Sequence, residues 1–155
     1  MTDLTPLANH RPLPDGAVWM PLLPVDLSML DSDLSPVDIQ RVLINAASGP
    51  CGSLWVHGQP LCAVGIANRL GGLGEAWAVI DKHRRHQYPL LLTRAIRDVI
   101  DIGVQSLDLS EVQMFVQFSQ ANAMKWAKAL GFKLQGELVF YEHPKRNHFI
   151  YSRSF

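Results

Sequence analysis

The residues best suited to chemistry form one charged segment near the middle of the chain. Seven consecutive side chains there carry positive charge, imidazole rings, an amide and a phenol: Lys82, His83, Arg84, Arg85, His86, Gln87 and Tyr88. Pro89 follows them and suits the first position of a helix. A turn that opens a helix presents backbone N–H groups and positive dipole potential to an anion. The segment 82–88 is therefore a candidate phosphate-binding turn, and a solvated basic turn is the alternative.

Two carboxylates stand near the ends of the apolar segment before this turn. Glu75 lies close to its start, and Asp81 directly follows it. A general base must come within hydrogen-bond reach of the proton that it removes, so both are candidates by position, with an exposed strand-end carboxylate as the alternative for each. His83 and His86 have the spacing of helical metal ligands, but they precede Pro89 and have no third ligand nearby. We therefore expect no metal site there.

Hydrophobic periodicity predicts the elements that must position this turn. Alternating apolar residues indicate strands, and apolar residues at i, i+3, i+4 and i+7 indicate helices. In order, the expected elements are a strand over Leu73–Ile80, a helix from Pro89 to a stop at Gly103, a strand over Val112–Phe118, a helix capped by Ser119 or Gln120 and ended by Gly131, and a hairpin of Gly136–His143 with His148–Arg153. The candidate turn thus connects a strand to a helix.

The preceding part of the chain has weaker signals. Three prolines without an apolar period predict an extended arm rather than a helix over Met1–Gly16. The elements expected after the arm are an edge strand over Ala17–Leu22, a helical turn from Asp26 to Leu30, and a helix that is capped by Ser35, runs to about Ser48 and turns Asn45 toward solvent. A hydroxyl cap followed by proline makes the Ser35 helix the most clearly marked of these.

One cysteine, Cys62, falls in a predicted hairpin of Gly52–His57 with Leu61–Asn68, and the other, Cys51, directly precedes it. A two-residue turn at Gly58–Gln59 would place Cys51 and Cys62 four strand pairs apart. We therefore expect no disulfide and treat both as buried thiols, since free cysteine usually behaves as a small core residue.

Composition limits the class of protein. The chain has 155 residues, which fits one domain over residues 17–155 after the arm. Its formal charge is zero and 48% of its residues are hydrophobic, which indicates neither disorder nor a nucleic-acid-binding surface. No apolar stretch is long enough to span a membrane, and no signal peptide is evident. We expect a cytoplasmic protein with no membrane or specific nucleic-acid partner.

The order of elements resembles that of the GNAT acyltransferases over nearly the whole chain. This resemblance implies an α/β (α+β) fold with a mixed, mostly antiparallel twisted sheet of about seven strands flanked by about four helices. It also implies acetyl-CoA as ligand, with its pyrophosphate held by a turn written Q/R-x-x-G-x-G/A. In this chain His83 or Arg84 takes the first position of that turn. His86 or Gln87 and Tyr88 or Pro89 take the two glycine positions.

The same resemblance identifies where a general acid would lie. In many GNAT enzymes a tyrosine in the pattern N-x-x-A-x-x-x-Y-x-x-L-G-F protonates the leaving thiolate. Leu130-Gly131-Phe132 matches the end of the pattern and places Ala127 at the tyrosine. Alanine has no proton to donate, so Tyr88 and Tyr141 are the candidate substitutes.

Two functions from different classes remain open. The chain is similar to the degenerate GNAT-like proteins of tailed bacteriophages in three parts, Trp77, Lys82–His86 and Trp126–Phe132. That similarity implies a phage-encoded virion, assembly or interaction component, whose partners are virion proteins or further copies of itself, and whose basic turn faces solvent or an acidic surface. The alternative is an acetyl-CoA-dependent N-acetyltransferase that acts on a primary amine of a small molecule or protein.

Overall fold

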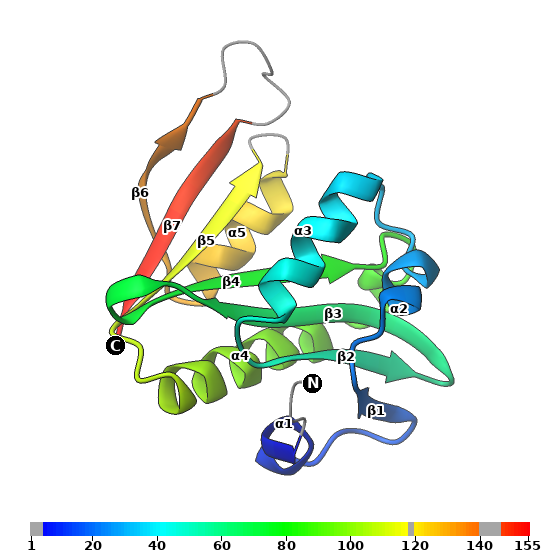
Figure 1. The fold of residues 1–155 in the computed structure, drawn as a ribbon. Coiled ribbons are helices and arrows are strands. Elements are labelled where there is room, and N and C mark those ends of the chain that lie inside the picture. The colour runs from blue at the N-terminus through cyan, green and yellow to red at the C-terminus, as the bar shows by residue number, and fades with distance from the viewer. Residues whose placement is uncertain (1–4, 118–119, 140–146) are drawn as a thin grey trace.

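The computed structural model of the protein describes residues 5–117, 120–139 and 147–155 (Figure 1). Its strands are β1 (Ala17–Met20), β2 (Cys51–Val56), β3 (Gln59–Asn68), β4 (Leu73–Ile80), β5 (Glu111–Gln117), β6 (Lys133–Leu138) and β7 (His148–Ser154). Its α-helices are α1 (Thr5–His10), α2 (Pro24–Met29), α3 (Pro36–Ala46), α4 (Pro89–Ser106) and α5 (Ala121–Ala129), and two 3₁₀ turns cover Leu70–Gly72 and Arg85–Gln87.

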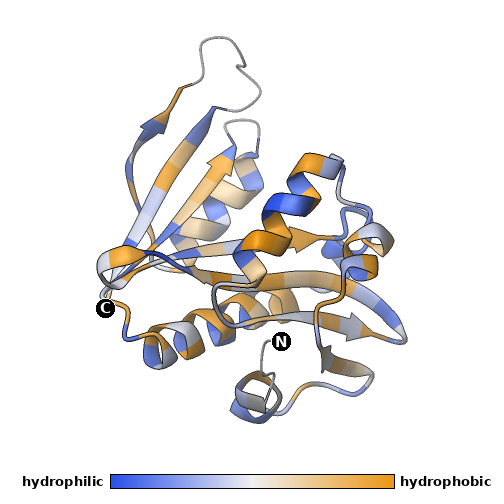
Figure 2. Ribbon diagram, viewed as in Figure 1, coloured by the Kyte–Doolittle hydropathy of each residue, from blue (hydrophilic) through white to orange (hydrophobic). Residues whose placement is uncertain are grey.

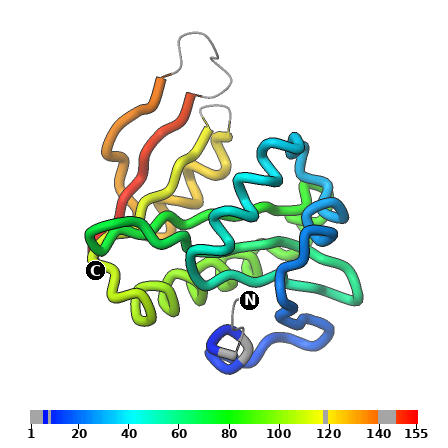
Figure 3. Tube along the Cα trace, in the orientation of Figure 1, coloured from blue at the N-terminus to red at the C-terminus, as the bar shows by residue number. Residues whose placement is uncertain are grey.

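The described strands form one seven-stranded sheet in the order β1-β2-β3-β4-β5-β7-β6. Neighbouring strands are antiparallel except β4 and β5, which run parallel and pair only over Leu73–Glu75 and Glu111–Gln113. Beyond these residues the two strands diverge, as the traces in Figures 1 and 3 show. The mixed, mostly antiparallel sheet expected from the sequence is confirmed, and its centre carries a splayed strand pair.

Helices cover both faces of the sheet. One apolar cluster joins α1, α4 and α5 to the sheet, and a second joins α2 and α3 to the opposite face. Side chains of β4 alternate between the two, with Ala76 and Ile80 in the first cluster and Trp77 and Val79 in the second. Figure 2 shows hydrophobic and hydrophilic residues alternating along α3 and α4, as two helices with one buried side require.

The helix starts follow the predicted chemistry. The Ser35 hydroxyl accepts a hydrogen bond from the Asp38 N–H at 3.2 Å, while the Asp38 carboxylate accepts one from the Ser35 N–H. This reciprocal pair is a capping box. Pro89 occupies the first position of α4, as predicted. Both helices therefore begin where local sequence chemistry places them.

Helix α5 ends at the predicted Gly131, which follows the C-cap Leu130 and has a φ angle of 88°, but the end of α4 and the N-terminal arm depart from prediction. Gly103 does not end α4, which continues to Ser106. Gly103 is instead a packing position, because a Cβ there would lie 2.7 Å from Cδ1 of Ile66. The arm predicted to be extended contains helix α1, and Leu7 on that helix is 2% exposed and part of the core. A tertiary contact therefore stabilises a helix that the local sequence does not indicate.

The hairpin register also differs from the prediction. The turn lies at His57–Gly58, whose φ angles of 50° and 78° suit a two-residue hairpin turn, rather than at Gly58–Gln59. Cys62 consequently pairs with Leu54, and Cys51 pairs with Gly65. Neither cysteine is in a disulfide and both are buried, as expected, and burial raises the pKa of the Cys62 thiol to about 12.

The start of β6 and the burial of Asn45 also differ from the prediction. Strand β6 begins at Lys133 rather than Gly136, and residues 140–143 of the predicted strand lie outside the described part of the chain. Asn45, predicted to face solvent, is buried. Within the described residues, no helix is long and apolar enough to cross a membrane.

Candidate functional site

The candidate turn folds around the carboxylate of Asp81, which directly follows β4. Asp81 is 7% exposed, and its Oδ1 accepts hydrogen bonds from the backbone N–H groups of His83 and Arg84, each at 3.0 Å. Its Oδ2 accepts the N–H of Asp31 at 3.2 Å. The Arg85 N–H donates to the Asp81 carbonyl. Three successive N–H groups of the turn are thus engaged within the chain.

These bonds lower the pKa of Asp81. Burial on its own would raise the pKa of this carboxyl group. Hydrogen bonds from the backbone of Arg84, Asp31 and His83, together with the positive charge of Arg84, outweigh burial and lower the pKa below its ordinary value. Asp81 is therefore a carboxylate at neutral pH and a weak base, which argues against its predicted role as a general base.

An acidic loop between α2 and α3 neutralises the first basic residues of the turn. The Lys82 ammonium lies 2.7 Å from Asp33 Oδ1 and 3.2 Å from Asp31 Oδ1, and His83 Nε2 lies 2.5 Å from Asp31 Oδ2. Hydrogen bonds to Asp33 and then Asp31 raise the pKa of Lys82. The partners of Lys82 and His83 therefore come from the same chain. The sequence reading missed the acidic partners, although the like charges of the turn signal that counter-charges are needed.

Arg84 acts as a cap on the β2–β3 hairpin. Its guanidinium donates to the backbone carbonyls of Val56 at 3.0 Å, Pro60 at 3.2 Å and Gln59 at 3.3 Å. Its Cζ also lies 5.7 Å from the centre of the Tyr88 ring. The expectation that the basic turn faces solvent or an acidic surface is therefore wrong for Arg84, because its guanidinium hydrogen-bonds the backbone carbonyls of the hairpin.

The remaining residues of the turn lie on its outer side. Arg85, His86 and Gln87 form the 3₁₀ turn before α4, and all three are exposed. The side chains of Arg85 and His86 have no polar partner among the described residues. Tyr88 is half-buried and packs against the main core, as the residue before the helix. Tyr141 lies outside the described residues.

Glu75 belongs to a separate cluster at the other end of β4. Arg69 donates to Glu75 Oε2 from Nε at 3.0 Å and from Nη2 at 2.7 Å, and Nη2 also donates to Asn45 Oδ1 at 2.9 Å. A strand rises about 3.3 Å per residue, so Glu75 and Asp81 are separated by roughly 20 Å. The two predicted carboxylates do not share one site. The sequence reading also missed Arg69, which determines the environment of Glu75.

The position expected for a general acid lies inside the core. Ala127 on α5 is 3% exposed. The preceding residue, Trp126, donates from Nε1 to Thr93 Oγ1 at 2.9 Å, and the Thr93 hydroxyl donates to the Pro89 carbonyl at 2.9 Å. This chain of bonds ties α5 to the first turn of α4. Trp126 therefore holds α5 against α4 through its indole N–H, and it does not serve as a general acid.

Where β4 and β5 diverge, β4 has an open edge. The Asp81 N–H donates to the Leu61 carbonyl, and Ile80 lies opposite Cys62. Because alternate residues of an antiparallel strand point their backbone groups to opposite sides, the N–H and C=O groups of Ala78 and Ile80 face away from β3. Pairing with β5 ends at Glu75, and Ala78 is exposed. This edge can hydrogen-bond an extended ligand that carries amide groups.

A hollow of about 260 Å³ lies on the side of the turn that faces α2. It is lined by Met29, Gln59, Pro60, Asp81 and Arg84. The Asp81 carboxylate and the Arg84 guanidinium on its wall are already engaged in the bonds described above. The hollow therefore presents a charge-balanced surface rather than a free anion site.

Comparison with known proteins identifies the type of fold. No protein-family model and no curated protein sequence matches the chain. Its structure is similar to that of the ribosomal-protein-S5-alanine acetyltransferase from Vibrio fischeri, at 15% identity, a TM-score of 0.68, and coverage of 92% of this chain and 94% of that one. Ard1 from Thermoplasma volcanium gives 13% identity, a TM-score of 0.70, and coverage of 90% and 97%.

A GNAT-family acetyltransferase from Bacillus anthracis is similar at 10% identity, with a TM-score of 0.67 and coverage of 90% of this chain and 95% of that one. Identities this low are informative about architecture alone. The structural similarity nevertheless extends over 90–92% of this chain for all three neighbours. The chain therefore has the fold of the GNAT acetyltransferases.

Proposed function

We propose that this chain uses the GNAT fold as a protein-interaction component and does not transfer acetyl groups. The observation that carries the proposal is the Asp81 carboxylate within the turn where the fold would hold a pyrophosphate. It takes the N–H groups of His83 and Arg84 as donors. A pyrophosphate in the same place would lack these donors and would meet a negative charge.

The candidate side chains for chemistry support the same conclusion. Ala127 occupies the position of the expected tyrosine and is buried. Glu75 is held by Arg69, and Asp81 is a weakened base at some distance from it. No step of acyl transfer can be derived through these residues. We therefore assign no catalytic role to Glu75 or Asp81.

A protein partner would meet the outer side of the turn. Arg85 and His86 are exposed, and Leu90 in the first turn of α4 is 85% exposed. Two basic side chains beside an uncovered leucine suit a partner surface that combines carboxylates with apolar groups. A virion or assembly role in a tailed phage is the specific form of this proposal. It is supported by the resemblance in Trp77, Lys82–His86 and Trp126–Phe132.

One observation favours the alternative, an acetyl-CoA-dependent N-acetyltransferase. The open edge of β4 at Ala78 and Ile80 offers backbone groups to an extended amide-bearing ligand. That feature is compatible with the amide-containing arm of acetyl-CoA. The turn, however, provides no matching place for the pyrophosphate, so the alternative is the less well supported of the two.

Capture of partners from the native source tests the proposed surface. Arg85→Glu should reduce partner recovery, and added salt should reduce recovery by the unchanged protein, because exposed charges are screened. Lys128→Glu is the matched control, since Lys128 is an exposed residue of α5 and the charge change is the same. Equal recovery by wild-type, Arg85→Glu and Lys128→Glu proteins at low salt would exclude this surface.

A further inference from the structure

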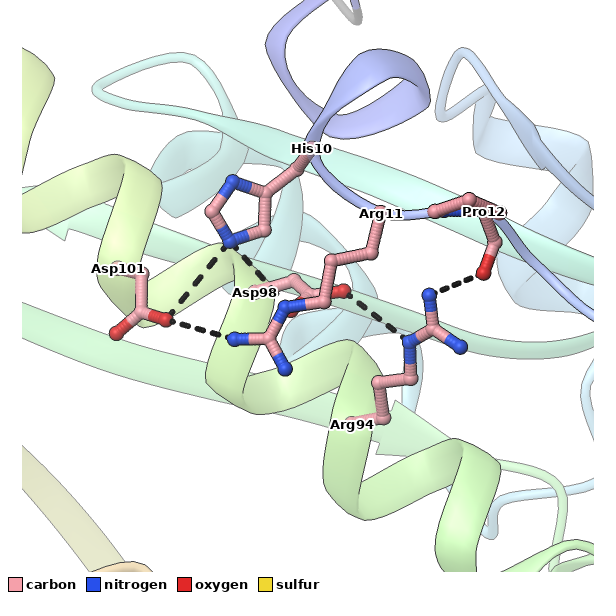
Figure 4. Close-up of polar contacts among 6 residues, drawn as sticks. All are labelled: His10, Arg11, Pro12, Arg94, Asp98 and Asp101. Carbon is pink, nitrogen blue, oxygen red and sulfur yellow. Dashed lines mark hydrogen bonds and ion pairs between the residues drawn. The ribbon is translucent and has the colours of Figure 1, made fainter.

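A compact group of charged side chains joins the N-terminal segment to the outer side of α4. His10 and Arg11 come from the end of α1, and Asp98 and Asp101 lie one helical turn apart on α4 (Figure 4). Asp98 has a side chain that is 2% exposed, whereas His10 is 25% and Asp101 41% exposed. The group lies away from the turn after β4 and is not used in the function proposed above.

Two buried atoms of this group have no hydrogen-bond partner among the described residues. They are His10 Nε2 and Asp98 Oδ1, and they face each other across 3.6 Å. His10 Nε2 also lies 3.8 Å from Asp101 Oδ2. A hydrogen bond between imidazole and carboxylate needs about 2.7–3.0 Å, so these separations are too long for one. Asp98 Oδ1 has an ion pair with Arg11 Nε at 3.2 Å, so His10 Nε2 is the atom of the two that calls for a further group.

The spacing fits a shared metal ion. The three ligand atoms of His10, Asp98 and Asp101 all lie within 4.8 Å of one another. Ligands at about 2.1 Å from a tetrahedral zinc ion are about 3.4 Å apart, close to the observed 3.6 and 3.8 Å. One imidazole with two carboxylates is a donor set that suits Zn²⁺ and related transition-metal ions better than Mg²⁺.

Arg11 already neutralises this position in part. Its Nε lies 3.2 Å from Asp98 Oδ1, and its Nη2 lies 3.5 Å from Asp101 Oδ2. The guanidinium thus bridges the same two oxygens that a metal ion would bridge. Its side chain is 48% exposed, so it can move into solvent. Arg94 differs, because it binds the Pro12 carbonyl and lies 3.7 Å from the other oxygen of Asp98.

We propose that His10, Asp98 and Asp101 form a site for a divalent transition-metal ion, Zn²⁺ by chemistry, and that Arg11 competes with the ion for the two carboxylates. Bound metal joins α1 to α4 and fixes the N-terminal segment against the core, where Leu7 is already buried. A water molecule completes the coordination, since the chain supplies three ligands. The site is a clamp for the N-terminal segment.

Titration calorimetry with ZnCl₂, and in parallel with MgCl₂, tests the proposal on the full chain after removal of metals. Wild-type protein should bind one Zn²⁺ per chain and no Mg²⁺ at the same concentration. His10→Gln and Asp101→Asn should each abolish this binding, with thermal melting of each variant to establish that it folds. The partly exposed ligands are chosen because Asp98 variants risk unfolding.

Arg11→Gln distinguishes a metal site from a simple ion-pair latch. If Arg11 competes with the ion, its removal tightens Zn²⁺ binding severalfold; if the group is held only by ion pairs, removal yields no tighter binding. Asp31→Asn is the control for adventitious surface binding, because Asp31 contacts His83 in an exposed cluster, and it should leave the Zn²⁺ affinity unchanged. Absence of zinc binding to the wild-type chain, binding retained in His10→Gln, or no tightening in Arg11→Gln would each overturn the proposal.

Discussion

Among individual residues, Arg84 has the clearest structural role. It donates to three backbone carbonyls of the β2–β3 hairpin, whereas its neighbour Arg85 is exposed. Arg84→Ala should therefore lower the free energy of unfolding by about 1–3 kcal/mol, because it removes three hydrogen bonds to backbone carbonyls. Arg85→Ala should change it by less than about 0.5 kcal/mol. Urea unfolding of both variants provides the measurement, and equal effects would show that Arg84 does not cap the hairpin.

Asp81 makes the stability of the fold depend on pH. Its pKa is lower in the folded chain than in the unfolded chain, so its hydrogen bonds stabilise the fold above the unfolded value of about 3.9 and are lost as pH falls through the folded value. Asp81→Asn should be less stable than wild type at pH 7, and the difference should shrink below about pH 4. Urea unfolding from pH 7 to pH 3 measures this difference. A gap that stays constant or widens on acidification would contradict the assigned role.

Some of these contacts between residues could be predicted from the sequence alone, and others could not. Local chemistry at Ser35 and Pro89 predicted both helix starts, because each signal lies within a few residues. The acidic partners of Lys82, which are Asp31 and Asp33, are distant in sequence and were missed. Charge partners that folding brings together leave no periodic or local pattern in the sequence. The pairing of Lys82 with Asp31 and Asp33 therefore could not be predicted.

At the scale of elements, the strands that enclose the site and the end of α5 at Gly131 were predictable, whereas the end of α4 was not. Strand β4 has the predicted bounds Leu73–Ile80 because its apolar pattern is bounded by glycines and a carboxylate. Gly103 was predicted to stop α4, but the residue is required by close packing on Ile66. Helix α1 depends on burial of Leu7, which no local periodicity announces.

Gly103→Ala tests this explanation of the glycine. Alanine favours a helix interior by about 1 kcal/mol over glycine. The added Cβ would nevertheless lie 2.7 Å from Ile66 Cδ1, so we expect a net loss of about 1–3 kcal/mol in unfolding free energy. Combining it with Ile66→Val removes that methyl group and should recover part of the loss. A Gly103→Ala protein that is more stable than wild type in chemical denaturation would show that packing does not require the glycine.

At the scale of the whole molecule, the chain has the fold of the GNAT acetyltransferases. The polar groups of the turn after β4 are largely bound by other groups of the same chain. The splayed β4–β5 pair leaves an open backbone edge at Ala78 and Ile80. The turn beside it is closed on Asp81, and two of its cations are engaged, Lys82 with Asp31 and Asp33 and Arg84 with the hairpin carbonyls. In the function proposed above, the chain keeps this fold without an acetyl-CoA site.

Calorimetric titration of the wild-type chain with acetyl-CoA tests the central claim most directly. A ligand at a hundredfold excess over its dissociation constant stabilises a fold by about 2.7 kcal/mol, so a parallel thermal melt at millimolar acetyl-CoA provides a second readout. Our account predicts no saturable heat and no rise in melting temperature. Saturable binding of one acetyl-CoA per chain, with a melting temperature raised by several degrees, would contradict it and favour the acetyltransferase.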